Sequence, residues 1–183
     1  IHGPSPSILF DTEVFPSVDE NQKIIPPEID GIKVMSMGML VSENQPLLWR
    51  GPMVTSAIKQ FAEEFKWGEL DVMVFDLPPG TGDVPLTIFQ SLPVDGIVVV
   101  TSPQELVSMI VTKAVNMARM MDIPVLGIVE NMSYFMCPDC GKKHEIYGKS
   151  HIDEIAKESG IDTVAKLPMD MAVAAKVDAG LAE

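Results

Sequence analysis

The sequence has 183 residues, of which 46% are hydrophobic and 21% are charged, and its formal net charge is −13. This length and composition are typical of one globular domain, which we expect to span residues 1–183. The acidic charge argues against nucleic acid and anionic membranes as partners, because both bind clustered Lys and Arg. No apolar run approaches the ~18–20 residues that a membrane span needs.

Short apolar runs alternate with helical patterns along the chain. The runs predict strands at residues 32–38, 71–76, 96–102, 125–132 and 163–168. Apolar residues at helical spacing predict helices at residues 53–65, 82–92, 103–121, 150–160 and 171–180. Such alternation predicts an α/β fold, with a mostly parallel sheet and helices on both faces.

The helical patterns also predict buried faces and helix ends. In helix 53–65 the expected buried face is Val54, Ile58, Phe61 and Phe65. In helix 103–121 the expected apolar stripe is Leu106, Ile110, Ala114, Met117 and Met121. Asp83 is a plausible N-cap for helix 82–92, and Gly160 ends helix 150–160.

In a parallel sheet, ligands bind where strands end at their carboxyl side. The segment "VFDLPPGTGD" places Asp76 at such an end, followed by a Pro-Pro-Gly turn that includes Pro79 and Gly80. A carboxylate there can hold Mg²⁺ through water, and the rigid turn lets a backbone N–H approach a terminal phosphate. The same residues also fit a simple strand-to-helix turn in which Asp76 and Asp83 only cap backbone N–H groups.

Two further strand ends carry polar residues. Asn131 lies at the end of strand 125–132, and its amide can both donate to and accept from an adenine edge, although the residue taken alone favours a turn asparagine. Pro168 and Asp170 mark the end of strand 163–168 and carry a weak signal by themselves.

A phosphate loop of the form G-x-x-x-x-G-K-[ST] is absent from the 183 residues. The tripeptide "GKS" at residues 148–150 is not one, because Lys143 stands where the first glycine is required and a polar loop precedes it. The chain also opens at Ile1 in a Gly/Pro/Ser-rich turn with no preceding strand, so we expect that upstream residues are missing.

The only two cysteines, Cys137 and Cys140, form a Cys-x-x-Cys pair in "YFMCPDCGKKHE". A closed metal site has four ligands, so this pair of thiols would supply half of such a site. One alternative is a structural zinc site in a single chain, completed by His144 and His151, although the spacing is poor for a zinc finger. A thioredoxin-type redox pair is disfavoured, because such pairs begin a helix after a strand.

Four phrases, "WRGPMV", "DLPPGTGD", "VTSPQELV" and "VENMSYFMCPDCGKKHEIYG", together resemble the Mrp/ApbC family of iron–sulfur cluster carriers. These are MinD-like P-loop ATPases, and the resemblance runs from Gly3 to about Gly180. It implies that this chain is the carboxyl-terminal two-thirds of such a domain, with the phosphate loop upstream. Whether the chain is an enzyme is therefore left open, since ATP hydrolysis by these residues alone is not expected.

The resemblance also assigns roles to residues. It makes Asp76 the Mg²⁺-side carboxylate of an ATP site, and Pro79 and Gly80 its γ-phosphate switch. It places Asn131 against adenine and lines the base pocket with Pro168 and Asp170. Gly3, Pro4 and Ser5 match the other switch.

For the cysteines, the resemblance implies a [4Fe–4S] cluster bridged between the two chains of a homodimer, with two thiolates from each. Recipient iron–sulfur apo-proteins would be the partners. Lys142, Lys143 and Lys149 could offset the charge of a thiolate-bound cluster, or simply be solvated. One departure concerns residues 149–151, where the family usually has further glycines and this chain has Lys-Ser-His.

The sequence also limits where the protein acts. Two closely spaced cysteines are not a secreted disulfide framework, and no signal peptide leads the chain, so we expect a cytoplasmic protein. A membrane-binding positioning ATPase is disfavoured, because the terminal "KVDAGLAE" is acidic and such a role needs a basic amphipathic helix.

Overall fold

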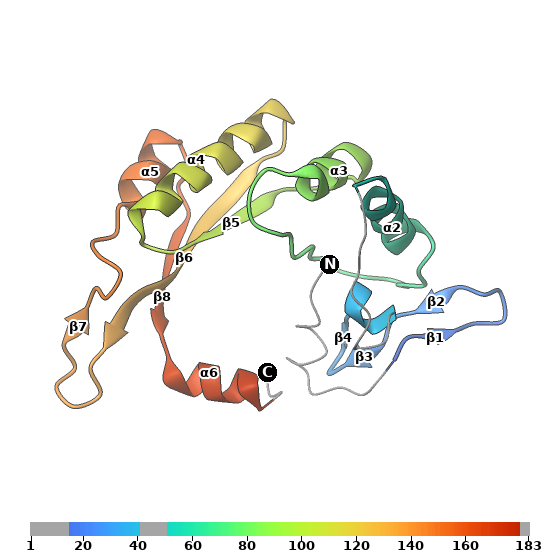
Figure 1. Ribbon diagram of the computed structural model, residues 1–183, viewed down its shortest axis with the longest axis horizontal. Coiled ribbons are helices and arrows are strands. Elements are labelled where there is room, and N and C mark those ends of the chain that lie inside the picture. The colour runs from blue at the N-terminus through green and yellow to red at the C-terminus, as the bar shows by residue number, and fades with distance from the viewer. Residues whose placement is uncertain (1–14, 41–50, 180–183) are drawn as a thin grey trace. The chain divides into compact units, whose positions relative to one another are not determined.

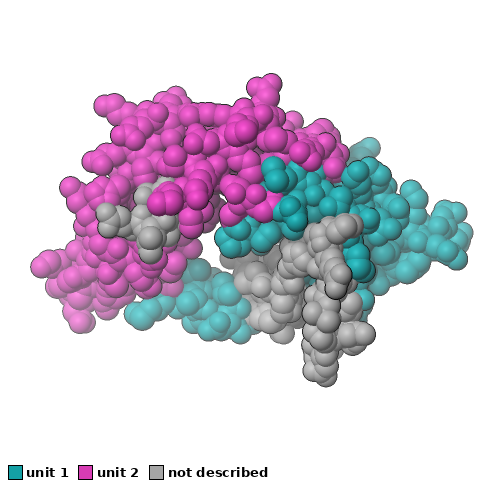
Figure 2. Space-filling view, turned by 45° about the horizontal axis from the view of Figure 1, so that its top comes forward, with its two compact units in different colours: residues 1–79, 83–87, 171–183 teal, residues 80–82, 88–170 magenta. Residues whose placement is uncertain are grey.

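The computed structural model describes residues 15–40 and 51–179 of the chain (Figure 1). The chain forms two compact units (Figure 2). Unit 1 comprises residues 1–79, 83–87 and 171–183, and unit 2 comprises residues 80–82 and 88–170. Helix α3 (Asp83–Ser91) contributes to both units. In the described residues, no helix has the length and apolar character needed to cross a bilayer.

Unit 1 begins with two short antiparallel hairpins. Strands β1 (Ser17–Val18) and β2 (Ile24–Ile25) form the first, and β3 (Glu28–Ile29) and β4 (Ile32–Lys33) form the second. The second hairpin turns at Asp30 and Gly31, which both have positive φ, as a two-residue Asp-Gly turn requires. The predicted strand 32–38 is therefore wrong beyond Lys33, and a 3₁₀ turn, η1 (Met37–Leu40), follows.

The core of unit 1 forms on helix α2 (Gly51–Glu63). Ile58, Phe61 and Phe65 are buried, as the helical spacing predicts, whereas the side chain of Val54 lies outside the described residues. Phe61 and Phe65 meet edge to face with ring centroids 4.7 Å apart. Trp67 packs beside them and donates its indole N–H to the Phe61 carbonyl at 2.6 Å. The unit also holds α6 (Met171–Asp178), which has no buried residue.

The predicted strand 71–76 is not a strand in the structure. Its valines are strongly exposed, with Val72 at 76% and Val74 at 84%. A strand inside a parallel sheet is stabilised by ladder hydrogen bonds from its neighbours. None of the described strands pairs with residues 71–76, so the segment stays extended and irregular despite its apolar sequence.

Unit 2 is built on a mixed sheet whose central strand is β6 (Val125–Met136). Strands β5 (Ile97–Thr101) and β8 (Val164–Met169) lie parallel to it, and β7 (Lys143–His144) pairs antiparallel with its distal end. Helices α4 (Glu105–Met120) and α5 (Ile152–Glu158) pack together on one face of this sheet (Figure 1). The α/β class predicted from the sequence is confirmed.

The most buried face of α4 is shifted by one residue from the predicted stripe, although Ala114 of that stripe packs, partly buried, against the same core. Val111, Val115 and Ala118 are buried at 1% exposure or less, whereas Ile110 is 47% exposed. The side chain of Leu106 lies outside the described residues. The sequence does not fix the buried face of α4, because residues next to the predicted stripe are also apolar. Contact with Val99 and Ile128 of the sheet decides which of them are buried.

Helix ends follow the prediction in one case and not in the other. Gly160 has φ +60° after α5, and the N–H of Ile161 donates to the Ala156 carbonyl at 2.9 Å, which is a glycine C-terminal cap. The sequence predicts Asp83 as the N-cap of α3, and this is wrong. Gly82 occupies the N-cap position, without a side-chain hydrogen bond to the helix. Asp83 lies instead in the first turn, where a negative charge favours the helix dipole.

Two neighbouring residues of α4 test this packing. We expect Val111→Ala to lower the free energy of unfolding by about 2 kcal/mol, because it opens space in the core. Ile110→Ala removes more carbon but should change stability by less than about 0.5 kcal/mol, because its side chain is half-exposed. Urea unfolding followed by circular dichroism measures both, and a larger loss for Ile110→Ala would contradict the observed face.

Candidate metal centre

The two cysteines lie at the tip of a β-hairpin that extends from the central strand of unit 2. Strand β6 continues to Met136, and β7 pairs back on it through Phe135 with His144 and Met136 with Lys143. Between the strands, the N–H of Cys137 donates to the Lys142 carbonyl at 2.9 Å, and the N–H of Gly141 donates to the Cys137 carbonyl at 2.9 Å. These bonds close a tight turn at residues 137–142, which we call the knuckle. Gly141 has φ +67° in this turn, a conformation that glycine adopts readily.

The knuckle favours the thiolate form of Cys137. The backbone N–H groups of Cys140 and Asp139 and the thiol of Cys140 donate to the Cys137 sulfur, and together they lower its pKa from the ordinary value of 9.0. Both cysteines are free, Cys137 half-buried and Cys140 exposed. One turn therefore holds two free thiols, and one of them has a lowered pKa.

No third ligand joins them within the described chain. Across residues 15–40 and 51–179, no group of three or more His, Cys, Asp or Glu side chains is placed to hold a metal. His151 instead approaches Glu154, with 3.3 Å between Nδ1 and Oε2. The alternative of a one-chain zinc site with His144 and His151 therefore has no support, and the role of the two cysteines as metal ligands stays a prediction.

Three lysines lie on the segment that carries the cysteines, although the chain as a whole is acidic. Lys142, Lys143 and Lys149 are exposed around the hairpin. Lys143 Nζ lies 4.1 Å from the centroid of the Tyr134 ring, a cation–π contact that holds its charge along the hairpin. Asp139 and Glu145 are exposed on the same segment, so acidic and basic side chains are mixed there.

The residues predicted for a nucleotide site are divided between the two units. Asp76 and Pro79 belong to unit 1 and Gly80 to unit 2, all three in an irregular segment. Gly80 has φ +92°, a conformation that residues with a Cβ rarely adopt. Gly3, Pro4 and Ser5 lie outside the described residues.

Within unit 2, the predicted base-pocket residues come from neighbouring strands. Asn131 lies on β6, Pro168 of β8 pairs with Tyr134 of β6, and Asp170 directly follows β8. The Asn131 Oδ1 atom accepts the N–H of Met132 at 2.9 Å, which fixes the orientation of the amide. The structure thus brings Asn131 and Pro168 to the same end of the sheet, and their role against adenine stays a prediction.

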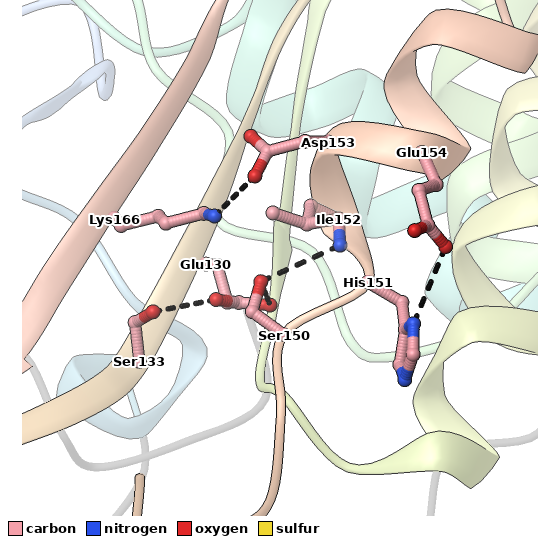
Figure 3. Close-up of polar contacts among 8 residues, drawn as sticks. All are labelled: Glu130, Ser133, Ser150, His151, Ile152, Asp153, Glu154 and Lys166. Carbon is pink, nitrogen blue, oxygen red and sulfur yellow. Dashed lines mark hydrogen bonds and ion pairs between the residues drawn. The ribbon is translucent and has the colours of Figure 1, made fainter. Parts of the chain in front are cut away.

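The sequence analysis missed a buried glutamate beside these residues. Glu130 is 1% exposed, and its carboxylate accepts hydrogen bonds from Ser133 at 2.6 Å and Ser150 at 2.9 Å (Figure 3). Near it, Lys166 pairs with Asp153. The available signal was a charged residue inside the apolar run "VLGIVENM", where burial demands partners.

A pocket of about 230 Å³ lies next to this carboxylate, where β5 ends and α5 begins. Its lining residues are Thr101, Ser102, Pro103, Gln104, Glu130, His151, Ile152, Glu154 and Ile155. The pocket is open to solvent on the side of His151 and Glu154, which are both exposed.

The chain matches a family of iron-transfer P-loop NTPases and is similar to proteins named as iron–sulfur cluster carriers. The ParA family described as "NUBPL iron-transfer P-loop NTPase" matches residues 1–182. An "Iron-sulfur cluster carrier protein" of Pyrococcus furiosus is 43% identical over 192 residues, covering 99% of this chain and 65% of that protein. One from Aquifex aeolicus is 46% identical, covering 98% of this chain and 50% of its own length. The chain thus spans about half to two-thirds of these relatives.

One solved structure shows the same fold. A nucleotide-binding protein from Archaeoglobus fulgidus, solved in complex with ADP, matches with a TM-score of 0.84 and 37% sequence identity. The match covers 98% of this chain and 70% of that one.

The environment of Cys137 predicts its reactivity. Backbone donors stabilise the thiolate, so it should persist to lower pH than in an ordinary thiol. In a Cys140→Ala variant both backbone N–H donors remain. We expect the alkylation rate of its Cys137 to rise with pH, and the pH midpoint of that rise to lie below the ordinary pKa of 9.0. The same variant unfolded in urea is the matched control, and equal midpoints in the two states would contradict the knuckle geometry.

Proposed function

Because the chain belongs to the NUBPL iron-transfer P-loop NTPase family, we propose that it carries an iron–sulfur cluster on Cys137 and Cys140 and delivers it to apo-proteins. The observation that carries this proposal is the pair of free thiols at an exposed hairpin tip, with no third ligand among the described residues. A resident structural metal would need a closed ligand set, whereas cargo must be reachable.

The cluster is proposed to be a [4Fe–4S] cubane held between two copies of the chain. A two-fold axis through the site would turn two thiolates into four, the number that such a cluster takes. Lys142, Lys143 and Lys149 would offset the negative charge that four thiolates bring together. Ligand counting supports the homodimer, because each chain offers only two cysteines.

Delivery is proposed to proceed by exchange of thiolate ligands. A thiolate of the recipient binds iron while a cysteine thiolate of the carrier leaves, so each step replaces one iron–sulfur bond by another and transfers no electron. The exposed Cys140 is reachable by an incoming ligand. The backbone donors that lower the pKa of Cys137 also stabilise it as it leaves.

ATP with Mg²⁺ is proposed as the nucleotide of the full protein. Asp76, Pro79 and Gly80 would complete its phosphate side, with Gly3 and Ser5 as the other switch. Asn131, Pro168 and Asp170 would complete its base side. The ADP bound in the Archaeoglobus fulgidus structure supports a nucleotide site on this fold. The phosphate loop itself is absent from the 183 residues.

We propose the cytoplasm as the compartment, because exposed thiols stay reduced there. The partners are a second copy of the chain and recipient apo-proteins. Neither nucleic acid nor a membrane is proposed, since the net charge of −13 opposes both.

Iron stoichiometry tests the shared site. We expect anaerobic reconstitution to yield about four irons per two chains, as a bridging cubane requires. Cys137→Ala and Cys140→Ala should each abolish iron binding, because either leaves two thiols in the whole dimer. Iron and sulfide assays measure this.

His144→Ala is the control for that experiment, since it alters the hairpin without removing a thiol. It should keep the full iron content. One zinc per chain that disappears with His144→Ala would overturn the cluster site in favour of a zinc site.

Nucleotide binding by the chain as printed gives another test. We expect negligible ATP hydrolysis and weak or undetectable ATP binding, because the phosphate loop supplies most of the positioning and charge stabilisation. A longer protein that carries the loop should bind Mg²⁺–ATP, and Asp76→Ala should impair its turnover. Calorimetric titration of both lengths decides, and tight Mg²⁺-dependent binding to residues 1–183 would show that the nucleotide site is misplaced.

A further inference from the structure

Glu130 is the buried charged residue of unit 2 that the proposed chemistry does not use. It is 1% exposed, and a charge removed from water needs compensating hydrogen bonds. Ser133 Oγ donates to Oε2 at 2.6 Å and Ser150 Oγ donates to Oε1 at 2.9 Å, so both carboxylate oxygens are used (Figure 3). A carboxylate is an acceptor only, which suits two hydroxyl donors.

The bond to Ser133 depends on an irregularity in β6. Residues three apart on a regular strand point to opposite faces of the sheet, so Ser133 should point away from Glu130. The pairing with β8 shifts between them, because Glu130 pairs with Lys166 and Tyr134 with Pro168. Four steps on β6 thus match two on β8, and Met132 in the bulge has φ +54°. The bulge turns Ser133 back to the side of Glu130.

The second hydrogen bond to Glu130 comes from Ser150, which follows the cysteine hairpin in the sequence. Ser150 precedes α5, and its Oγ also accepts the N–H of Ile152 at 3.4 Å. Ser150 is one of the residues at which this chain departs from the glycines that the sequence resemblance led us to expect. Its hydroxyl therefore links the start of α5 and the strand β6 through one carboxylate.

Glu130 thus holds both ends of one segment. Ser133 lies immediately before residues 134–149 and Ser150 immediately after them, and both cysteines lie between. Tying the two ends to one carboxylate restricts how the hairpin can tilt on the sheet. Two half-sites that must meet across a two-fold axis require such a fixed direction.

We propose that Glu130 is a positioning residue for the cluster thiols: through Ser133 and Ser150 it anchors both ends of the cysteine hairpin and sets its orientation. This rests on the proposed cluster-carrying function. Groups that orient metal ligands without touching the metal typically change affinity by about 10–100-fold when they are mutated.

The test compares cluster loss from reconstituted holo-protein to an iron chelator under anaerobic conditions. We expect Glu130→Gln to lose its cluster about 10-fold faster than wild type, because an amide offers one acceptor oxygen where two are used. Ser150→Ala should speed the loss about 3-fold, and Ser150→Thr, which keeps the hydroxyl, should return it to the wild-type rate. Glu154→Gln, an exposed residue of the adjacent pocket, is the matched control and should have no effect.

A second measurement needs no cluster. In cluster-free protein, amide hydrogen exchange of residues 134–149 should be faster in Glu130→Gln and Ser150→Ala, while exchange in the α4 core stays at the wild-type rate. Ser150→Ala in the Glu130→Gln background should add little, because both changes break the same anchor.

The outcomes separate this inference from the proposed function. If wild type takes up no cluster, the carrier function fails, and the exchange data alone decide the anchor. If wild type holds a cluster and both variants match it in cluster loss and hydrogen exchange, the positioning role is overturned. If Glu130→Gln does not fold, the Ser150→Ala and Ser150→Thr pair decides, and equal rates for these two variants overturn it.

Discussion

The proposed function depends on one constraint: the sequence offers two cysteine thiols, whereas a closed iron–sulfur or zinc site takes four ligands. Cys137 and Cys140 share one turn, and neither His144 nor His151 joins them in a metal-binding group within the described residues. In the proposed function, a second chain would complete the site and a recipient would empty it. The exposed position of Cys140 and the lowered pKa of Cys137 would favour both events.

The fold of unit 2 explains how such a small site can be held in place. Strand β6 lies at the centre of the sheet, with β5 and β8 beside it and α4 and α5 against one face, and the hairpin is simply its extension. Rigid packing around Ile128 thus passes directly into the strand that ends at the cysteines. The bulge after Glu130 interrupts that continuity, and the two serine bonds compensate at this point.

The parts that could be predicted are those with local causes. Helix α2 follows from apolar spacing and the end of α5 from Gly160, whereas the role of the two cysteines as metal ligands stays a prediction. Residues 71–76 could not be predicted, because an apolar run becomes a strand only beside another strand. The phase of α4 was wrong by one residue, since Ile110 and Val111 are both apolar and tertiary contact decides between them. Glu130 was missed because its partners, Ser133 and Ser150, are brought to it by a bulge and a distant loop. The nucleotide roles of Asp76, Asn131 and Asp170 stay predictions.

The central claim is that two chains share one cluster, and native mass spectrometry of the anaerobically reconstituted protein tests it most directly, because one ion reports both the chain number and the cluster number. The account predicts that the cluster-bearing species contains two chains and one [4Fe–4S] cluster. It also predicts that removal of the cluster shifts the protein from dimer toward monomer. A single chain that carries a complete cluster would contradict it, since the described residues of one chain provide only the two thiols of Cys137 and Cys140.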